Sequence, residues 1–500
     1  MQEGLTKSTS KALSWSYAGS FVRLLLTFGV NILLTRLLGP KPFGLLAIAM
    51  LLFGLGNLLA GIGVTTALIQ KPAISRRDIR FCFSVQTLLG SFAALILFLS
   101  APAMAAFFRQ QELTQVLRAL APLFLLQSFG ATASALLSRE QNTRSIQIAS
   151  IISYLVAFLG LAVPMALMGY GIWSVVTAYL VQALINNILI YAMKRHSLVP
   201  LLHRDQIGLL KFGVSNFGAN LSNWGISNLD NTFVGRMSGP LALGFYSRAF
   251  TLASLPAESV VMNLLQVLLP AFSRVQARSD CLRRTYIAAV GLVAIVLLPA
   301  FFGMAAVPGV VVLGLYGAKW AGAVRLFQPL ALAIPVNALM ALSGPLLAAR
   351  GKPHVEMSLQ FAVVLIAGYA FWFSVSHSVL WLSWTVLLIY LLRFALLTNA
   401  ALREIGARWN DILRSIWPAL VLAVFAASLA SAIDGATPPI ASGARLAVVV
   451  GGTAIPTLLL LVLGRNILLR PVLRNMPQFE DFLRTRRAHF APVPPVEAVR

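Results

Sequence analysis

Long apolar stretches of about 20 residues or more alternate with short polar segments along most of the chain. Such stretches fit a bilayer, whose hydrocarbon core a helix of about 20 residues crosses. The pattern predicts an all-α polytopic membrane protein with about fourteen transmembrane helices. Their approximate ranges are 14–36, 43–69, 81–107, 115–138, 146–168, 171–193, 209–234, 242–269, 285–307, 324–349, 356–376, 379–401, 415–433 and 443–464.

Lysines and arginines fall mainly on one side of the predicted membrane. If the N-terminus is cytoplasmic, most of the 39 basic residues lie in cytoplasmic segments and few lie in the opposite loops. Cytoplasmic loops of membrane proteins carry such an excess. The pattern therefore predicts that both termini are cytoplasmic. It also accounts for the formal net charge of +24 without nucleic-acid binding.

Two segments 200 residues apart share the same turn residues. Residues 31–44 read NILLTRLLGPKPFG, and residues 231–244 read NTFVGRMSGPLALG. A second pair of words, PAISR at 72–76 and PAFSR at 270–274, follows in the same order. The copies lie six helices apart, so both run in the same direction through the membrane. They predict two six-helix bundles in a parallel pseudo-two-fold repeat, plus two C-terminal helices.

The shared residues have a structural interpretation. Gly-Pro after an arginine is a helix stop and turn. Arg36 and Arg236 are then predicted to anchor the outer boundary by snorkelling. The glycines and prolines are predicted to shape a hinge between the first two helices of each half. The predicted domains are an N-terminal bundle (1–193), a cytoplasmic linker (194–208), a C-terminal bundle (209–402), two further helices (403–464) and a basic cytoplasmic tail (465–500).

Composition narrows the function classes. The chain is 58% hydrophobic and 11% charged, whereas soluble domains carry roughly 25% charged residues. The predicted outer loops are too short to fold as domains, which argues against a membrane enzyme that works through a large outer loop. The phosphate-binding motif of ATPases, G-x-x-x-x-G-K-[ST], is absent from the sequence. Cys82 and Cys281 have no metal-binding spacing.

Polar residues form a stripe along the predicted seventh helix. Asn216, Asn220, Asn223, Ser227 and Asp230 recur at i, i+4, i+7, i+11 and i+14, which places them on an arc of roughly 80°. Polar groups facing lipid would be very costly, so this stripe must face protein or a water-filled cavity.

The first and eighth helices carry matching polar groups. Ser16, Ser20, Arg23 and Thr27 share one face of the first helix, and Asn31 lies near its edge. The eighth helix, the least apolar, adds Arg248, Thr251 and Glu258. The simplest assembly places these three helices around a central hydrophilic cavity.

Arginines in such a cavity predict an anionic cargo. The planar guanidinium of arginine binds two phosphate oxygens together, and asparagine and serine suit sugar hydroxyls. Phosphate and sugars together form the head group of a lipid-linked glycan. The predicted substrate-binding residues are Arg23, Asn31, Asn216, Asn220, Asn223, Asp230, Asn231 and Arg248. No catalytic or metal-binding residue is predicted.

Two of the intramembrane charges keep a second interpretation. Asp230 and Arg248 are also compatible with a buried ion pair that only fixes packing. Arg393 is ambiguous, and one interpretation is that it snorkels toward the cytoplasmic side.

The chain resembles the Wzx-type polysaccharide flippases of the multidrug/oligosaccharidyl-lipid/polysaccharide exporter superfamily. The resemblance rests on LLTRLLGPKPFGLLAIA in the first two helices, and on GIGVTTALIQKP (61–72), NLDNTFVGR (228–236), LGFYSRAF (243–250) and LLPAFSR (268–274). It implies a V-shaped pair of bundles that alternate between inward and outward openings. The last two helices match the fourteen-helix members.

The resemblance also implies a biological setting. The implied cargo is an undecaprenyl-diphosphate-linked oligosaccharide, which crosses the bacterial inner membrane for exopolysaccharide or lipopolysaccharide synthesis. Implied partners are the polymerase and glycosyltransferases of the same pathway, besides membrane lipids. No cofactor is predicted, but coupling to a proton or sodium gradient is implied. Asp230 and Glu258 are the coupling candidates, since a carboxylate in a low dielectric gains proton affinity.

Three other functions stay open. A multidrug exporter of the same superfamily would show fewer cavity arginines and more aromatic and acidic lining. A flippase for the peptidoglycan precursor would share the fold and have similar cations. A polymerase, ligase or acyltransferase of surface glycans should carry a catalytic set on a sizeable outer loop, and the sequence offers none.

Overall fold

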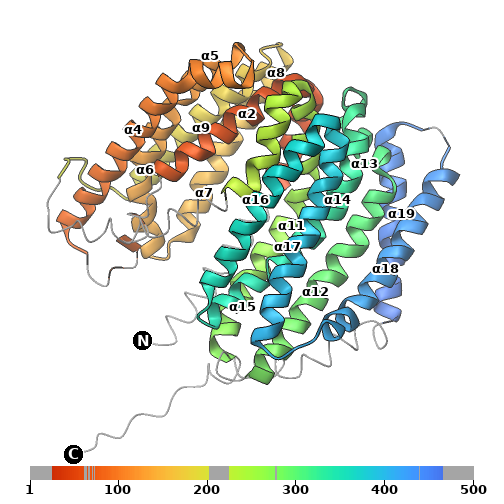
Figure 1. Ribbon diagram of the computed structural model, residues 1–500. Coiled ribbons are helices and arrows are strands. Elements are labelled where there is room, and N and C mark those ends of the chain that lie inside the picture. The colour runs from red at the N-terminus through yellow and green to blue at the C-terminus, as the bar shows by residue number, and fades with distance from the viewer. Residues whose placement is uncertain are drawn as a thin grey trace, which may run out of the picture.

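The structure is a computed structural model that describes residues 25–60, 65, 68–69, 71, 74–201, 224–275, 279–438 and 440–464. Every regular element in these ranges is a helix (Figure 1). The N-terminal half contains the helix Leu25–Leu38, α2 (Pro40–Ala60), α4 (Arg76–Phe108), α5 (Glu112–Leu120), α6 (Pro122–Arg139), α7 (Thr143–Tyr154), the π-helix Leu155–Ala162, α8 (Val163–Leu167) and α9 (Ile172–Met193). The C-terminal half contains a helix over 224–237, α11 (Gly239–Val275), α12 (Ser279–Ala306), α13 (Pro308–Tyr316), α14 (Ala321–Met340), α15 (Ser343–Ala349), α16 (Pro353–His377) and α17 (Val379–Glu404), followed by α18 (Trp409–Ala436) and α19 (Ser442–Leu463).

Eleven helical segments among the described residues are long and apolar enough to cross a membrane. They coincide with the predicted spans two to six and nine to fourteen. The eighth predicted span coincides with α11, and the first and seventh lie only partly within the described residues. The chain is therefore a multi-pass helical membrane protein, while the count of fourteen and the domain boundaries stay predictions.

The helices gather into two bundles. In the N-terminal bundle α6 packs against α4 and α9, and in the C-terminal bundle α12 packs against α14 and α18. Figure 1 shows the bundles closest together where α2 and α11 begin, and farther apart toward the opposite ends of these helices. We call the first of these the proline end, because Pro40 and Pro240 lie there. Contact between the bundles runs mainly through α2, which packs along α11.

The helices α2 and α11 begin in the same way. Gly39 has φ 85° and Gly239 has φ 79°, a left-handed conformation that glycine adopts without steric cost. The proline that follows each glycine has a fixed φ that suits the first turn of a helix. The predicted helix stop and turn is thus confirmed in both copies.

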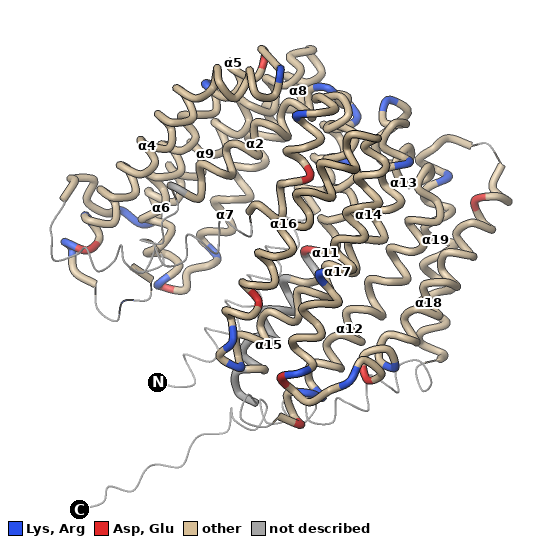
Figure 2. The backbone as a smooth tube through the Cα atoms, in the orientation of Figure 1, with Lys and Arg blue, Asp and Glu red and all other residues tan. Residues whose placement is uncertain are grey.

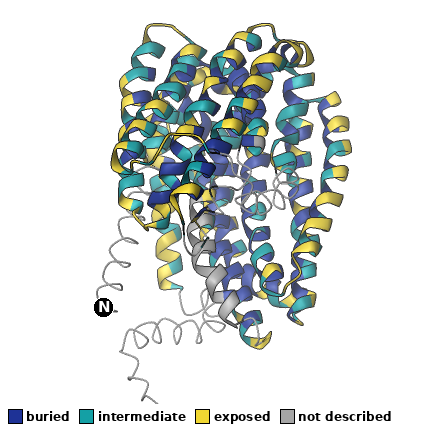
Figure 3. Cartoon of the chain, turned by 90° about the vertical axis from the view of Figure 1, so that its left-hand side faces the viewer, coloured by how far each residue is buried: buried dark blue, intermediate teal, exposed yellow. Residues whose placement is uncertain are grey.

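Side-chain exposure follows the membrane interpretation. Leu88, Phe92, Leu95 and Leu99 are exposed along α4, and Figure 3 shows exposed positions on helix faces that point away from neighbouring helices. Charged positions gather mainly at the helix ends (Figure 2). Lipid chains would cover the exposed apolar faces, as bilayer-spanning helices require.

Candidate functional site

The repeated glycines and prolines meet each other across the seam between the bundles. A Cβ atom added to Gly44 on α2 would lie 1.7 Å from the carbonyl oxygen of Pro240, and one added to Gly244 on α11 would lie 2.0 Å from that of Pro40. Only glycine allows this backbone approach. Gly44 and Gly244 thus face the opposite bundle, a contact that the predicted hinge within each half did not include.

The repeated arginines also reach across the seam. Arg36 donates hydrogen bonds to the carbonyls of Gly314 and Leu315, which belong to the last turn of α13. Helix C-termini leave such carbonyls unpaired and favour a cation nearby. The Arg236 guanidinium lies over the ring of Phe107, 5.1 Å from its centroid, at the end of α4. Both arginines therefore contact the opposite bundle, which the sequence did not predict, and their anchoring of the outer boundary stays a prediction.

Trp320 completes the closure of the proline end. Its indole nitrogen donates to the carbonyl of Thr35 over 2.9 Å, and its ring lies between Phe43 of α2 and Phe245 of α11 at centroid distances of 6.0 and 6.1 Å. The proline-end junction is our name for this set of contacts made by Gly44, Gly244, Arg36, Arg236 and Trp320. It holds the two bundles together at one end of the seam.

Arg248 projects from α11 into the same seam, and most of its neighbours belong to the N-terminal bundle. Its guanidinium lies 4.3 Å from the ring centroid of Phe43 and within 3.4 Å of the Asn31 side-chain oxygen. Tyr179 of α9 and Tyr316 of α13 interact with it electrostatically. Its Nε is buried without a hydrogen-bond partner, and no carboxylate that the structure describes forms an ion pair with it. A net positive charge is therefore held between the bundles.

Asp230 is bonded inside the C-terminal bundle instead of pairing with Arg248. Its side chain is 4% exposed. One carboxylate oxygen accepts a 2.5 Å hydrogen bond from the hydroxyl of Tyr246, and the other accepts from the backbone and side-chain amides of Asn231. The alternative of an Asp230–Arg248 ion pair is thus wrong, because these neutral donors occupy the carboxylate.

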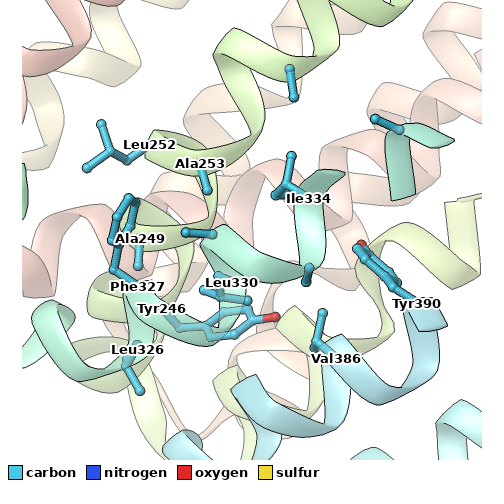
Figure 4. Packing of buried hydrophobic residues seen from close by; sticks show 14 of the residues in the cluster. Tyr246, Ala249, Leu252, Ala253, Leu326, Phe327, Leu330, Ile334, Val386 and Tyr390 are labelled. Carbon is cyan, nitrogen blue, oxygen red and sulfur yellow. The ribbon is translucent and has the colours of Figure 1, made fainter. Parts of the chain in front are cut away.

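Tyr390 and Arg393 are buried in the same bundle as Asp230. Tyr390 of α17 interacts electrostatically with Asp230, Arg393 and Glu258, and Figure 4 shows Tyr390 and Tyr246 among the packed core residues. Arg393 is 8% exposed and donates to the side-chain oxygens of Gln360 and Asn337 at 3.1 and 3.4 Å. The snorkelling interpretation of Arg393 is wrong, because its guanidinium points into the bundle.

The structure places the remaining candidates as follows. Asn31 and Asn231 contact Arg248 and Asp230, respectively. The Glu258 side chain is exposed on α11. Four predicted substrate-binding residues lie outside the residues that the structure describes: Arg23, Asn216, Asn220 and Asn223. Within the described ranges, no three His, Cys, Asp or Glu side chains are grouped to hold a metal ion.

Removing the Tyr246 hydroxyl should destabilise the protein. In Tyr246→Phe the buried Asp230 carboxylate loses a donor, which we expect to cost about 1–3 kcal/mol. Thermal unfolding of the detergent-solubilised protein measures this loss. Tyr369→Phe is the matched control, since Tyr369 is exposed. Equal unfolding temperatures for the two variants would mean that the Tyr246–Asp230 bond contributes nothing to stability.

Comparison with known proteins agrees with this architecture. The model of a family described as polysaccharide biosynthesis protein matches residues 33–325. The chain belongs to this family. This membership confirms the resemblance stated above, because all five sequence segments that carry it, from LLTRLLGPKPFGLLAIA to LLPAFSR, lie within the matched region.

Three relatives of this chain have names that refer to the synthesis or transport of polysaccharides. Teichuronic acid biosynthesis protein TuaB of Bacillus subtilis is 25% identical over 67% of this chain and 70% of its own length. Succinoglycan biosynthesis transport protein ExoT of Rhizobium meliloti is 28% identical, over 67% of this chain and 66% of its own length. Lipopolysaccharide biosynthesis protein WzxC of Escherichia coli is 23% identical over 72% and 73%.

Two solved structures share the fold of this chain. The lipid II flippase MurJ in an inward closed conformation aligns with a TM-score of 0.74 at 12% identity, covering 90% of this chain and 99% of MurJ. An inward-facing multidrug resistance transporter of the MATE family aligns with a TM-score of 0.61 at 16% identity, covering 76% and 94%. At these identities the likeness shows the fold alone.

Proposed function

We propose that the protein is a flippase, a transporter rather than an enzyme, that carries undecaprenyl-diphosphate-linked oligosaccharides from the cytoplasmic to the periplasmic face of the inner membrane. Membership of the polysaccharide biosynthesis protein family supports this function. The names of ExoT and WzxC, which refer to succinoglycan transport and lipopolysaccharide synthesis, support a role in making exopolysaccharide or lipopolysaccharide.

Arg248 is the observation that carries the proposal. A buried charge within membrane spans is costly unless it is paired or serves a ligand. Arg248 has amide and aromatic neighbours but no described carboxylate partner, so its positive charge is left for an anion. A diphosphate between the two bundles would supply that anion and accept the paired donors of the guanidinium.

The proline-end junction fits one state of an alternating-access cycle. With cytoplasmic termini, the predicted topology places Pro40 and Pro240 on the periplasmic side. The described conformation would then be closed outward, with the bundles diverging toward the cytoplasm, where the cargo is made. Delivery requires the junction to open while contacts form at the other end.

Ion coupling is part of the proposal. Asp230 and Glu258 both lie near Tyr390, so a proton or sodium ion at Asp230 would change the charge of one connected group of side chains. The polymerase and glycosyltransferases of the same pathway would act on the cargo after and before its transport, respectively.

A reconstituted assay tests the proposed function. The purified protein is placed in liposomes with undecaprenyl-diphosphate-linked oligosaccharide extracted from the source bacterium after depletion of this protein. Glycosidase added outside should cleave more of the oligosaccharide with time than in protein-free liposomes. Parallel liposomes contain the lipid-linked peptidoglycan precursor or a cationic dye. If only the precursor or only the dye were translocated, that compound would be the substrate and the proposed cargo would be wrong. If none of the three were translocated, the proposal of a flippase would be refuted.

A further inference from the structure

A half-open polar pocket of about 290 Å³ lies in the N-terminal bundle, where α6, α7 and α9 meet. Small-ligand sites have volumes of about 300–1,000 Å³, so the pocket is large enough for a unit of a larger ligand. None of its residues is among the predicted substrate-binding residues. Polar side chains from all three helices line it: Gln127, Ser134, Ser150, Tyr179, Gln182, Asn186 and Asn187.

One of these amides is fixed, and three are not. Asn187 donates a hydrogen bond to the carbonyl of Leu126, and its side-chain oxygen lies against Gly130. The side chains of Gln127, Gln182 and Asn186 form no hydrogen bond with any other residue in the described ranges. Amides at membrane depth require a polar partner, so water or a polar ligand must meet them.

The two sides of α9 show that this polar face is directed inward. Tyr179, Gln182 and Asn186 recur at i, i+3 and i+7, so they share one face of the helix. Leu184 and Ile188 lie on the other side and are 47% and 58% exposed, as lipid-facing residues are. The amide face of α9 therefore lies toward α6 and α7, and the aliphatic face points away from them.

Tyr179 connects the pocket to the seam between the bundles. It lines the pocket, and it also interacts electrostatically with Arg248 across the seam. Its ring is held edge-on by Phe158 at a centroid distance of 5.2 Å. Tyr179 is thus the pocket residue that interacts with Arg248.

We propose that the pocket lined by Gln127, Ser150, Tyr179, Gln182 and Asn186 binds sugar units of the transported oligosaccharide. This inference rests on the proposed function and adds the place where the glycan is recognised. Amide and hydroxyl groups donate to and accept from sugar hydroxyls, and the tyrosine ring offers an apolar surface to a sugar ring. None of the described residues that line the pocket is charged, so it suits uncharged sugars, while Arg248 binds the diphosphate.

Binding of two lipids to the full-length purified protein tests this division of roles. One probe is the lipid-linked oligosaccharide extracted after depletion of the protein, and the other is undecaprenyl diphosphate, which has no sugar. We expect Gln182→Leu and Asn186→Leu each to weaken binding of the first probe about 3- to 10-fold, the worth of one hydrogen bond. Binding of undecaprenyl diphosphate should stay unchanged, which also shows that the variants are folded.

Two further variants complete the comparison. Leu184→Ala, on the lipid-facing side of α9, should bind both probes like the wild type, and Arg248→Ala should lose affinity for both. The proposal is overturned if the leucine variants bind both probes normally, or lose both equally. If the wild type binds undecaprenyl diphosphate and the lipid-linked oligosaccharide with equal affinity, only the pocket proposal fails. If it binds neither probe, the proposed function fails with it.

A labelling experiment avoids the leucine variants altogether. In a variant lacking Cys82 and Cys281, Asn186→Cys places a thiol in the pocket. The lipid-linked oligosaccharide should slow alkylation of this thiol by a small maleimide, and undecaprenyl diphosphate should not. Equal protection by both lipids, or protection by neither, contradicts a sugar site there.

Discussion

Gly44→Ala should force the proline end open. The added methyl group would lie 1.7 Å from the carbonyl oxygen of Pro240, and a backbone atom cannot rotate away as a side chain can. Overpacking of this kind costs about 1–3 kcal/mol, so we expect the equilibrium to shift away from the closed proline end by about 5- to 150-fold. Transport should fall, because in the proposed cycle a protein that rarely closes at the proline end rarely accepts cargo.

Spin labels on both sides of the junction measure this opening. Suitable sites are Gln111 of the N-terminal bundle and Lys319 of the C-terminal bundle, both exposed, in a variant without native cysteines. Their distance should lengthen in Gly44→Ala and in Gly244→Ala. The control is Gly29→Ala, since a Cβ there has no neighbour within 4 Å. An unchanged distance distribution in both junction variants would show that these glycines do not set the closed state.

Arg248→Ala should abolish most transport without destabilising the protein. Hydrogen bonds to a charged group are worth about 1.5–3 kcal/mol, so we expect transport to fall by about 10- to 150-fold. Stability should hold or improve, because the variant removes a half-buried cation that has no described carboxylate partner. The liposome assay and thermal unfolding of the same preparation give the two values.

Substitutions at two positions separate charge from geometry. Arg248→Lys keeps the charge but loses the planar fork, so it should restore only part of the transport. Arg195→Ala should behave like the wild type, because Arg195 is exposed in the segment after α9. Normal transport by Arg248→Ala would refute the assignment of Arg248 as the anion-binding residue. If this variant also lost stability, the role of Arg248 would be in packing.

Much of the fold could be predicted from local signals. The length of each apolar run predicts its span, and the repeated Gly-Pro words predict two similar turns. The contact of Gly44 with Pro240 could not be predicted, because a sequence motif repeated in two helices does not show that the two copies are in contact. The same holds for Arg393. From the sequence, an arginine near a helix end could donate its hydrogen bonds to water or, as the structure shows, to Gln360.

The candidate site was predictable only where polar residues are dense on one helix. The seventh predicted helix carries a continuous stripe, so its asparagines stand out. The pocket in the N-terminal bundle draws its amides from α6, α7 and α9, and each helix supplies few. The i, i+3, i+7 spacing of Tyr179, Gln182 and Asn186 was the signal that could have indicated it.

The reciprocal contact at the proline end has an evolutionary consequence. Since the same residues appear on both partners, this surface is isologous, as in a homodimer with two-fold symmetry. Each half of the chain therefore carries a surface that fits the equivalent surface of the other half. Two identical ancestral subunits would already have fitted together here before fusion joined them. After fusion, neither glycine could be replaced by a larger residue without disturbing the partner half, which explains why the two words still match.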